Sequence, residues 1–125
     1  MRKVALGAAA ALLGISAGCG SAGLAGDYRW EAKVPERVAA GADFTFTVRT
    51  FRREAEGPVE ETGVPFEYAV AWPGGSTAPL RHQGYSGEEE RVRARVLPGT
   101  ARLLVYAPDE KGLSARVAQA EFLVE

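Results

Sequence analysis

Apolar and polar residues alternate along most of the chain from residue 27 onward, and no segment of ten or more residues has the spacing of an amphipathic helix. In residues 64–72, for example, an apolar side chain occupies every second position from Val64 to Trp72. This period of two gives each segment one apolar face, as a strand that packs on a core by one side requires. The pattern predicts seven strands, at residues 28–34, 43–51, 64–72, 80–85, 90–97, 100–107 and 115–124.

Proline and glycine separate these segments, at residues 35–41, 57–58, 73–75, 98–99 and 108–112. Seven short strands at this spacing are typical of an antiparallel β-sandwich. The segment at 80–85 has the weakest pattern of the seven. We expect it to join the strands at 28–34, 43–51 and 90–97 in one sheet, with the other three strands in the second sheet.

The first nineteen residues have the organisation of a secretory signal: Arg2 and Lys3, an uncharged apolar stretch over residues 4–15, and small residues before Cys19. The stretch is shorter than the roughly 20 residues that a transmembrane helix needs. Because Cys19 directly follows Ser16-Ala17-Gly18, the segment resembles the signal peptide of bacterial lipoproteins, although Ser16 stands where that family usually has leucine. The resemblance implies removal of residues 1–18 and lipidation of Cys19 through a diacylglyceryl thioether and an N-acyl group. Ordinary secretory cleavage, after Ala17-Gly18 or near Ala22, is the alternative.

These features divide the chain into a lipoprotein signal peptide (1–18), a flexible tether (19–26) and one sandwich domain (27–125). Loss of the signal removes two of the 15 basic residues and none of the 16 acidic ones, so the formal net charge changes from −1 to −3. This small charge favours neither nucleic acid nor general attraction to a membrane surface. Since Cys19 is the only cysteine, no disulfide can form within the chain, and packing has to supply the stability.

Within the sandwich, residues 41–48 (GADFTFTV), 57–59 (GPV) and 99–107 (GTARLLVYA) resemble the bacterial immunoglobulin-like domains of invasin-type surface proteins. The similarity extends over residues 41–124. Two features depart from that family: Gly84-Tyr85-Ser86-Gly87 replaces its acidic-glycine turn, and one domain stands where the family usually has several. The resemblance implies an immunoglobulin-like fold and a scaffold or interaction module, and it implies no catalytic or binding residue.

The residue types needed for common enzyme and metal sites are scarce. His82 is the only histidine, which excludes a multi-histidine zinc site, and the chain lacks methionine after the signal, which argues against copper handling. We expect His82 to be an exposed histidine on an edge strand. The aromatic residues that alternate with polar ones are expected to form the core rather than a sugar-binding surface. The sequence therefore predicts a protein without catalytic activity and without a cofactor.

Acidic residues cluster in the loops after the second, fourth and sixth predicted strands, which are expected to meet at one end of the sandwich. Calcium binds six to eight oxygen atoms, and such a cluster can supply carboxylates. No Asp-x-Asp or Asp-x-Asn spacing accompanies the cluster. The candidate ion-binding residues are Glu60, Glu61, Glu88, Glu89, Glu90, Asp109 and Glu110.

The outward positions of the two sheets differ in character. On the first sheet they are mostly basic, and include Arg49, Arg91, Arg93 and Arg95. On the second sheet they include several apolar residues, and an exposed apolar face indicates a binding surface. The candidate partner-binding residues are Leu104, Tyr106, Val117 and Leu123.

Taken together, the sequence predicts a lipid-anchored protein of the bacterial cell envelope that binds or scaffolds other molecules. In a cell with two membranes, Gly20 after the lipidated cysteine favours the outer membrane, because the retention signal of the lipoprotein family is usually an aspartate there. The expected partners are the membrane, through the lipid, and a protein or a second copy of the chain. The alternatives are an accessory lipoprotein that binds a solute or calcium at the acidic loops, and a small glycan hydrolase.

Overall fold

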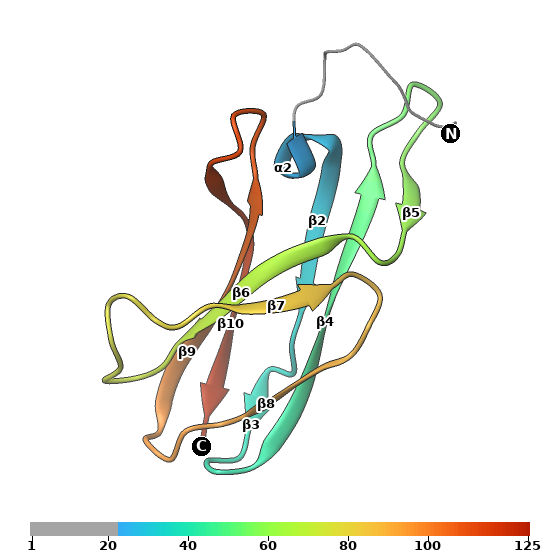
Figure 1. Ribbon diagram of the computed structural model, residues 1–125. Coiled ribbons are helices and arrows are strands. Elements are labelled where there is room, and N and C mark those ends of the chain that lie inside the picture. The colour runs from blue at the N-terminus through green and yellow to red at the C-terminus, as the bar shows by residue number, and fades with distance from the viewer. Residues whose placement is uncertain (1–22) are drawn as a thin grey trace.

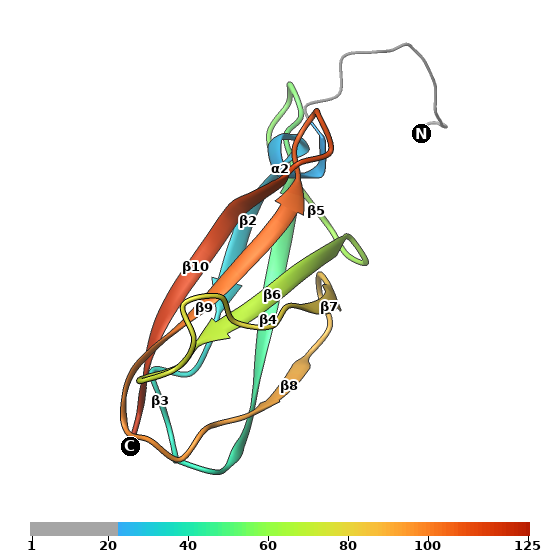
Figure 2. The ribbon, with the colours of Figure 1, turned by 60° about the vertical axis from the view of Figure 1, so that its left-hand side comes forward.

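The computed structural model describes residues 23–125, and they form an all-β sandwich preceded by one short helix (Figures 1 and 2). The predicted sandwich is confirmed. Among the described residues, no helix is both long and apolar enough to cross a membrane. The elements are α2 (Gly23–Asp27), β2 (Tyr28–Lys33), β3 (Arg37–Val38), β4 (Asp43–Arg52), β5 (Val59–Glu61), β6 (Pro65–Ala71), β7 (His82–Tyr85), β8 (Glu90–Arg93), β9 (Gly99–Pro108) and β10 (Ser114–Val124).

One sheet has five strands in the order β3-β10-β9-β6-β7, and the other contains β2, β4 and β5, with β8 also paired to β4. All pairs are antiparallel except that of β3 with β10. Strand β4 organises the second sheet, because β2 runs alongside it from Thr47 to Arg52 while β5 and β8 pair with its opposite ends.

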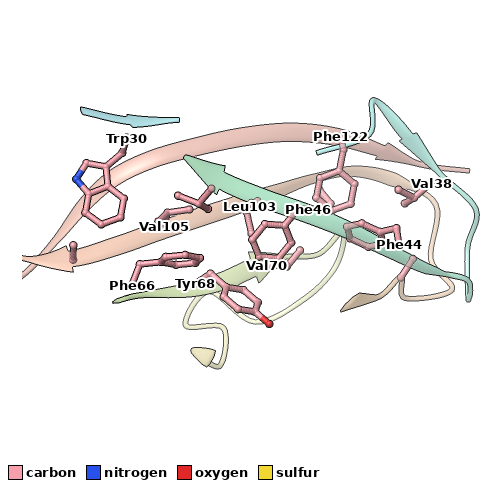
Figure 3. Close-up of a cluster of buried hydrophobic side chains, with 14 of the residues drawn as sticks. Trp30, Val38, Phe44, Phe46, Phe66, Tyr68, Val70, Leu103, Val105 and Phe122 are labelled. Carbon is pink, nitrogen blue, oxygen red and sulfur yellow. The ribbon is translucent and has the colours of Figure 1, made fainter. Parts of the chain in front are cut away.

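The core lies between the sheets and is built from the alternating apolar positions of both (Figure 3). Phe46 of β4 is 2% exposed, and its ring meets that of Tyr68 of β6 edge-on at 4.8 Å. Such edge-to-face pairs of aromatic rings add to the stabilisation that burial provides. The prediction that the aromatic residues pack inside is confirmed for Tyr28, Trp30, Phe44, Phe46, Phe66 and Tyr68, and Trp72 is partly buried against them.

The largest correction concerns the predicted strand at 80–85. Its residues His82–Tyr85 form β7, which pairs with β6 in the five-stranded sheet rather than with the strand at 90–97. The chain then crosses to the other sheet at Ser86 and Gly87, whose amides donate to Val64 and Val48 respectively. The position beside β8 in the second sheet, on the side away from β4, therefore carries no strand of the described chain.

The strand predicted over 90–97 is also shorter than expected. It ends at Arg93, and Val96, which alternation assigned to the core, is 78% exposed. Two segments predicted as loops contain short strands instead: β3, which pairs with Leu123 and Val124, and β5, which pairs with residues 50–52 of β4.

Residues 23–26 of the predicted flexible tether belong instead to α2, so the tether prediction is wrong for that part. Leu24 and Ala25 pack against the core, and the Trp30 indole N–H donates to the carbonyl oxygen of Leu24 at 3.3 Å. A Cβ on Gly23 would lie 2.3 Å from the backbone of Asp109, so only glycine allows this close approach to the β9–β10 hairpin. In Figure 1, α2, this hairpin and the β4–β5 loop lie at one end of the sandwich.

Candidate functional site

A cleft opens between the two sheets where β8 has no outer neighbour among residues 23–125. Its volume is about 440 Å³. We call it the arginine cleft, because three arginines of one segment line it together with residues from β6, β7 and the loop between them. Its lining residues are Tyr68, Val70, Trp72, Ser76, Ala78, Pro79, Leu80, His82, Arg91, Val92, Arg93 and Arg95.

The local geometry of β8 places the arginines along one rim of the cleft. Val92 and Ala94 face inward. The Ala94 amide donates to the carbonyl oxygen of Ala42 at 2.8 Å, and the Ala94 carbonyl oxygen accepts from the Gly41 amide at 3.1 Å. Because side chains alternate along a strand, Arg91 and Arg93 project to the opposite face, and their side chains are 74% and 73% exposed. Arg95, two residues after Arg93, is also exposed.

Little negative charge lies close enough to neutralise these arginines. The carboxylate of Asp43 lies 3.3 Å from the Arg93 guanidinium and 3.8 Å from that of Arg91. A single carboxylate therefore pairs with two guanidinium groups. Solvent-exposed pairs of this kind contribute little stability. No carboxylate from the described part of the chain lines the cleft. The rim therefore keeps a net positive charge and is suited to an anionic group.

The side of the cleft opposite the rim is aromatic. His82, on the edge strand β7, lies over the Tyr68 ring with the ring centroids 5.4 Å apart. The prediction of an exposed edge histidine is confirmed. Burial, and after it the charge of Glu90, raises the pKa of the Tyr68 hydroxyl, which therefore stays neutral at physiological pH. The cleft thus offers apolar surface and neutral polar groups beside a positive rim.

The structure does not bring the seven predicted ion-binding residues together. Among residues 23–125, no group of three or more histidine, cysteine, aspartate or glutamate residues could hold a metal ion. Glu60 makes a bidentate ion pair with Arg49, and the Glu90 carboxylate accepts from the Tyr85 amide at 3.3 Å. Glu88 and Glu89 lie in the turn before β8, whereas Asp109 and Glu110 lie in the β9–β10 hairpin at the α2 end (Figure 1). The predicted cluster is wrong because the loop between β7 and β8 does not reach that end.

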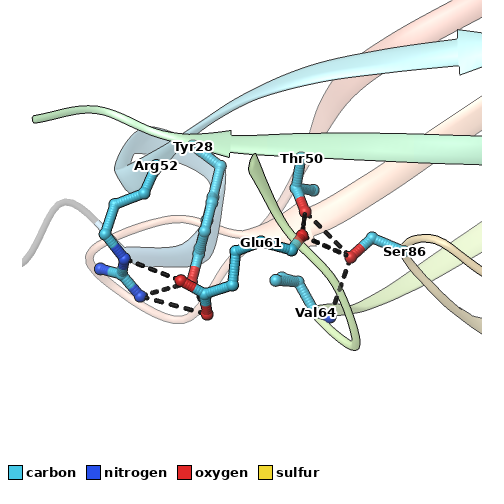
Figure 4. A network of polar contacts seen from close by, with 6 residues as sticks. All are labelled: Tyr28, Thr50, Arg52, Glu61, Val64 and Ser86. Atoms are coloured by element: carbon cyan, nitrogen blue, oxygen red, sulfur yellow. Dashed lines mark hydrogen bonds and ion pairs between the residues drawn. The ribbon is translucent and has the colours of Figure 1, made fainter. Parts of the chain in front are cut away.

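Two of these acids have structural roles instead. Asp109 accepts hydrogen bonds from the amides of Lys111 and Leu113, both at 2.9 Å, and so closes its own hairpin. Glu61 pairs with Arg52 at 2.9 Å and accepts from the Tyr28 hydroxyl at 2.8 Å (Figure 4). Burial, and after it the hydrogen bond to Glu61, raises the pKa of Tyr28 well above its usual range, although the nearby charge of Arg52 lowers it.

A buried hydroxyl pair lies next to that ion pair and joins the two sheets (Figure 4). Ser86 is 1% exposed, and its hydroxyl accepts from the Val64 amide at 3.0 Å and from Thr50 at 2.9 Å. Its own proton is directed to the Glu61 carbonyl oxygen, 3.2 Å away. With every polar atom paired and solvent excluded, these hydroxyls hold the crossover between β7 and β8 in place.

The expected apolar face of the five-stranded sheet is not a continuous exposed surface. Leu104, on the central strand β9, is only 5% exposed. Val117 is the extra residue of a bulge in β10 and packs toward the core, so its predicted outward direction is wrong. Leu123 is half-buried beside β3. The Arg81 guanidinium covers the half-buried Tyr106, 3.8 Å from the ring centroid.

The arginines of the cleft were recognisable in the sequence, because Arg91, Arg93 and Arg95 occupy every second position. The cleft itself was missed. The predicted fourth strand of the second sheet was expected to lie on the side of β8 that the structure leaves open. Cys19, the predicted lipidation site, lies outside the described residues.

No family model matches this chain, and neither a curated protein nor a solved structure is similar to it.

Proposed function

We propose that this protein is a lipid-anchored, immunoglobulin-like binding module of the bacterial cell envelope, without catalytic activity, and that its arginine cleft binds an anionic ligand. The observation that carries the proposal is the row of three arginines on the rim of an open cleft whose lining includes no acid. Concentrated positive charge beside a concave surface raises the local concentration of anions and speeds their association.

The position of the cleft suits a protein held at a membrane by its N-terminus. Four residues lead from Cys19 to Gly23, and at full extension they span at most about 14 Å. A lipid on Cys19 would thus keep the α2 end close to the bilayer. In Figure 1, β8 runs toward the end of the sandwich opposite α2, so its arginines would remain accessible to a ligand outside the membrane.

We expect the mature protein to begin at Cys19 and to carry covalent lipid. Two or more acyl chains are needed because a single chain binds a membrane only marginally. The intact mass of the protein purified from bacterial membranes measures this directly. A Cys19→Ser variant, which has no thiol for the thioether, is the control and should leave the membrane fraction. An unmodified N-terminus at any other residue would contradict the anchor.

We expect the triple variant Arg91→Glu, Arg93→Glu, Arg95→Glu to bind fluorescent polyglutamate at least about tenfold more weakly than the wild type in low salt, because each reversal replaces attraction by repulsion. The matched control carries the same change at exposed arginines outside the cleft: Arg29→Glu, Arg37→Glu, Arg53→Glu. Both variants have the same net charge. An equal loss in the two would mean that overall charge, and not the arginine cleft, attracts the anion.

A further inference from the structure

Resting on the proposed function, we propose that the ligand of the arginine cleft is an extended acidic peptide segment. It would add to the free edge of β8 as a further strand of the second sheet, with acidic side chains at alternate positions. Three observations lead to this occupant: the unpaired backbone of β8, the spacing of its arginines, and the apolar surface behind it.

The first observation is the direction of the backbone groups. In an antiparallel pair, the N–H and C=O of one residue point to the same side, and successive residues alternate. The amide of Ala94 donates toward β4, to Ala42 at 2.8 Å, so those of Arg91 and Arg93 point the other way. Figure 2 shows β8 at the margin of the molecule, with β4 on its inner side. The outer edge of β8 thus presents donors and acceptors in the pattern that an incoming strand pairs with.

The second observation is the charge along that edge. Residues two apart on a strand are separated by about 6.8 Å, so Arg91 and Arg93 repeat at the same interval as the alternate side chains of an added strand, and Arg95 lies just beyond the end of β8. Opposed cross-strand side chains lie about 5 Å apart, close enough for each arginine to pair with an aspartate or glutamate. A row of positive charges also repels basic strands, which makes the edge selective for an acidic one.

The third observation is the apolar surface that the other side chains of such a strand would contact. Those not facing the arginines would point into the cleft, toward Val92 and the aromatic rings of Tyr68 and Trp72. Apolar residues of moderate size fit this surface. The complementary segment therefore alternates acidic and apolar residues over about six positions, the length of β8 together with the two residues that follow it.

A peptide explains these observations better than a bilayer or an anionic glycan. Phosphate headgroups and uronic acids can neutralise arginines, but neither offers a regular row of N–H and C=O groups to pair with the backbone of β8. A flat membrane surface also cannot enter a cleft between two sheets. Backbone pairing is therefore the property that an experiment has to test.

The probe is a capped heptapeptide in which three aspartates alternate with four valines, and its binding to the full-length mature protein is followed by fluorescence anisotropy. Two further peptides carry backbone N-methyl groups, one on all the aspartates and the other on the three valines that follow an aspartate. Only one of the two sets of amides can face β8. We expect one methylated peptide to lose at least about tenfold in affinity and the other to stay within about twofold of the parent, because only one loses its backbone hydrogen bonds.

A peptide of the same composition with its aspartates contiguous should bind about tenfold more weakly than the alternating one, since at most two of its three acids can then lie on the side that faces the arginines. Equal affinity of both methylated peptides, or loss in both, overturns the added strand while leaving anion binding by the cleft intact. Arginine-dependent binding of polygalacturonate or of phosphatidylglycerol vesicles, without binding of the alternating peptide, also overturns it and reassigns the ligand. If no anionic probe distinguishes the wild type from the triple arginine variant, the proposed function itself fails.

Discussion

Replacing Phe46 with alanine is expected to lower the free energy of unfolding by about 3–5 kcal/mol, the largest effect that we expect from any single substitution in this protein. Phe46 lies at the centre of the core, in contact with Tyr68 of the opposite sheet. Its removal leaves a cavity between two sheets that strand pairing holds apart, so neighbouring side chains can fill the space only in part. Since domains of this size are stable by only about 5–15 kcal/mol, the variant should fold marginally.

Urea denaturation followed by tryptophan fluorescence measures this loss. The matched control is Phe51→Ala, the same change on the same strand but on its outer face, where the ring lies between the guanidinium groups of Arg29 and Arg49. We expect the control to lose about 1 kcal/mol or less. Comparable losses at the two positions would mean that the core does not lie between the sheets as described.

Replacing Ser86 with alanine is expected to cost about 1–3 kcal/mol, although it removes a single oxygen atom. The Val64 amide would lose its buried acceptor, and Thr50 would lose a partner. The same substitution at the exposed Ser76, whose hydroxyl accepts from the Ala78 amide, should change stability by less than about 0.5 kcal/mol.

A double-mutant cycle that combines Ser86→Ala with Thr50→Val measures the interaction energy between the two hydroxyls, apart from the contacts that each makes with other groups. Because the two hydroxyls are in direct contact, we expect the double variant to lose less than the sum of the single variants. Strict additivity would show that Thr50 and Ser86 act independently, and that the polar network does not operate as one unit.

Alternation predicted the long strands well, because each has one face against the core over many residues. The segments at 43–51, 100–107 and 115–124 differ from β4, β9 and β10 by one or two residues at their ends. The three residues of β5 are too few to show a period, and the pairing of β3 with β10 joins positions 86 residues apart. Such elements are fixed by tertiary contacts rather than by their own sequence.

The predicted placement of candidate site residues was wrong where it depended on how strands pair. The arginine row could be read from residues 91–95, but the cleft exists because β7 joins the opposite sheet, and alternation within a strand does not specify its partner. The bulge at Val117 also changed the expected apolar face, because Val117 packs toward the core instead of outward. The extra residue puts the neighbouring side chains of Val117 and Ala118 both toward the core, and no feature of the local sequence predicts it.

The parallel pairing of β3 with β10 has a consequence for the order in which the protein folds. Val38 pairs with Val124, and the Ala40 amide donates to the carbonyl oxygen of Glu125. Phe122 and Val124 also belong to the core. A chain that emerges from a ribosome or a translocon with its N-terminus first therefore cannot close the sandwich until residues 122–125 have been released. Because contacts so distant in sequence form slowly, the strands before β10 should remain without their final packing until that point.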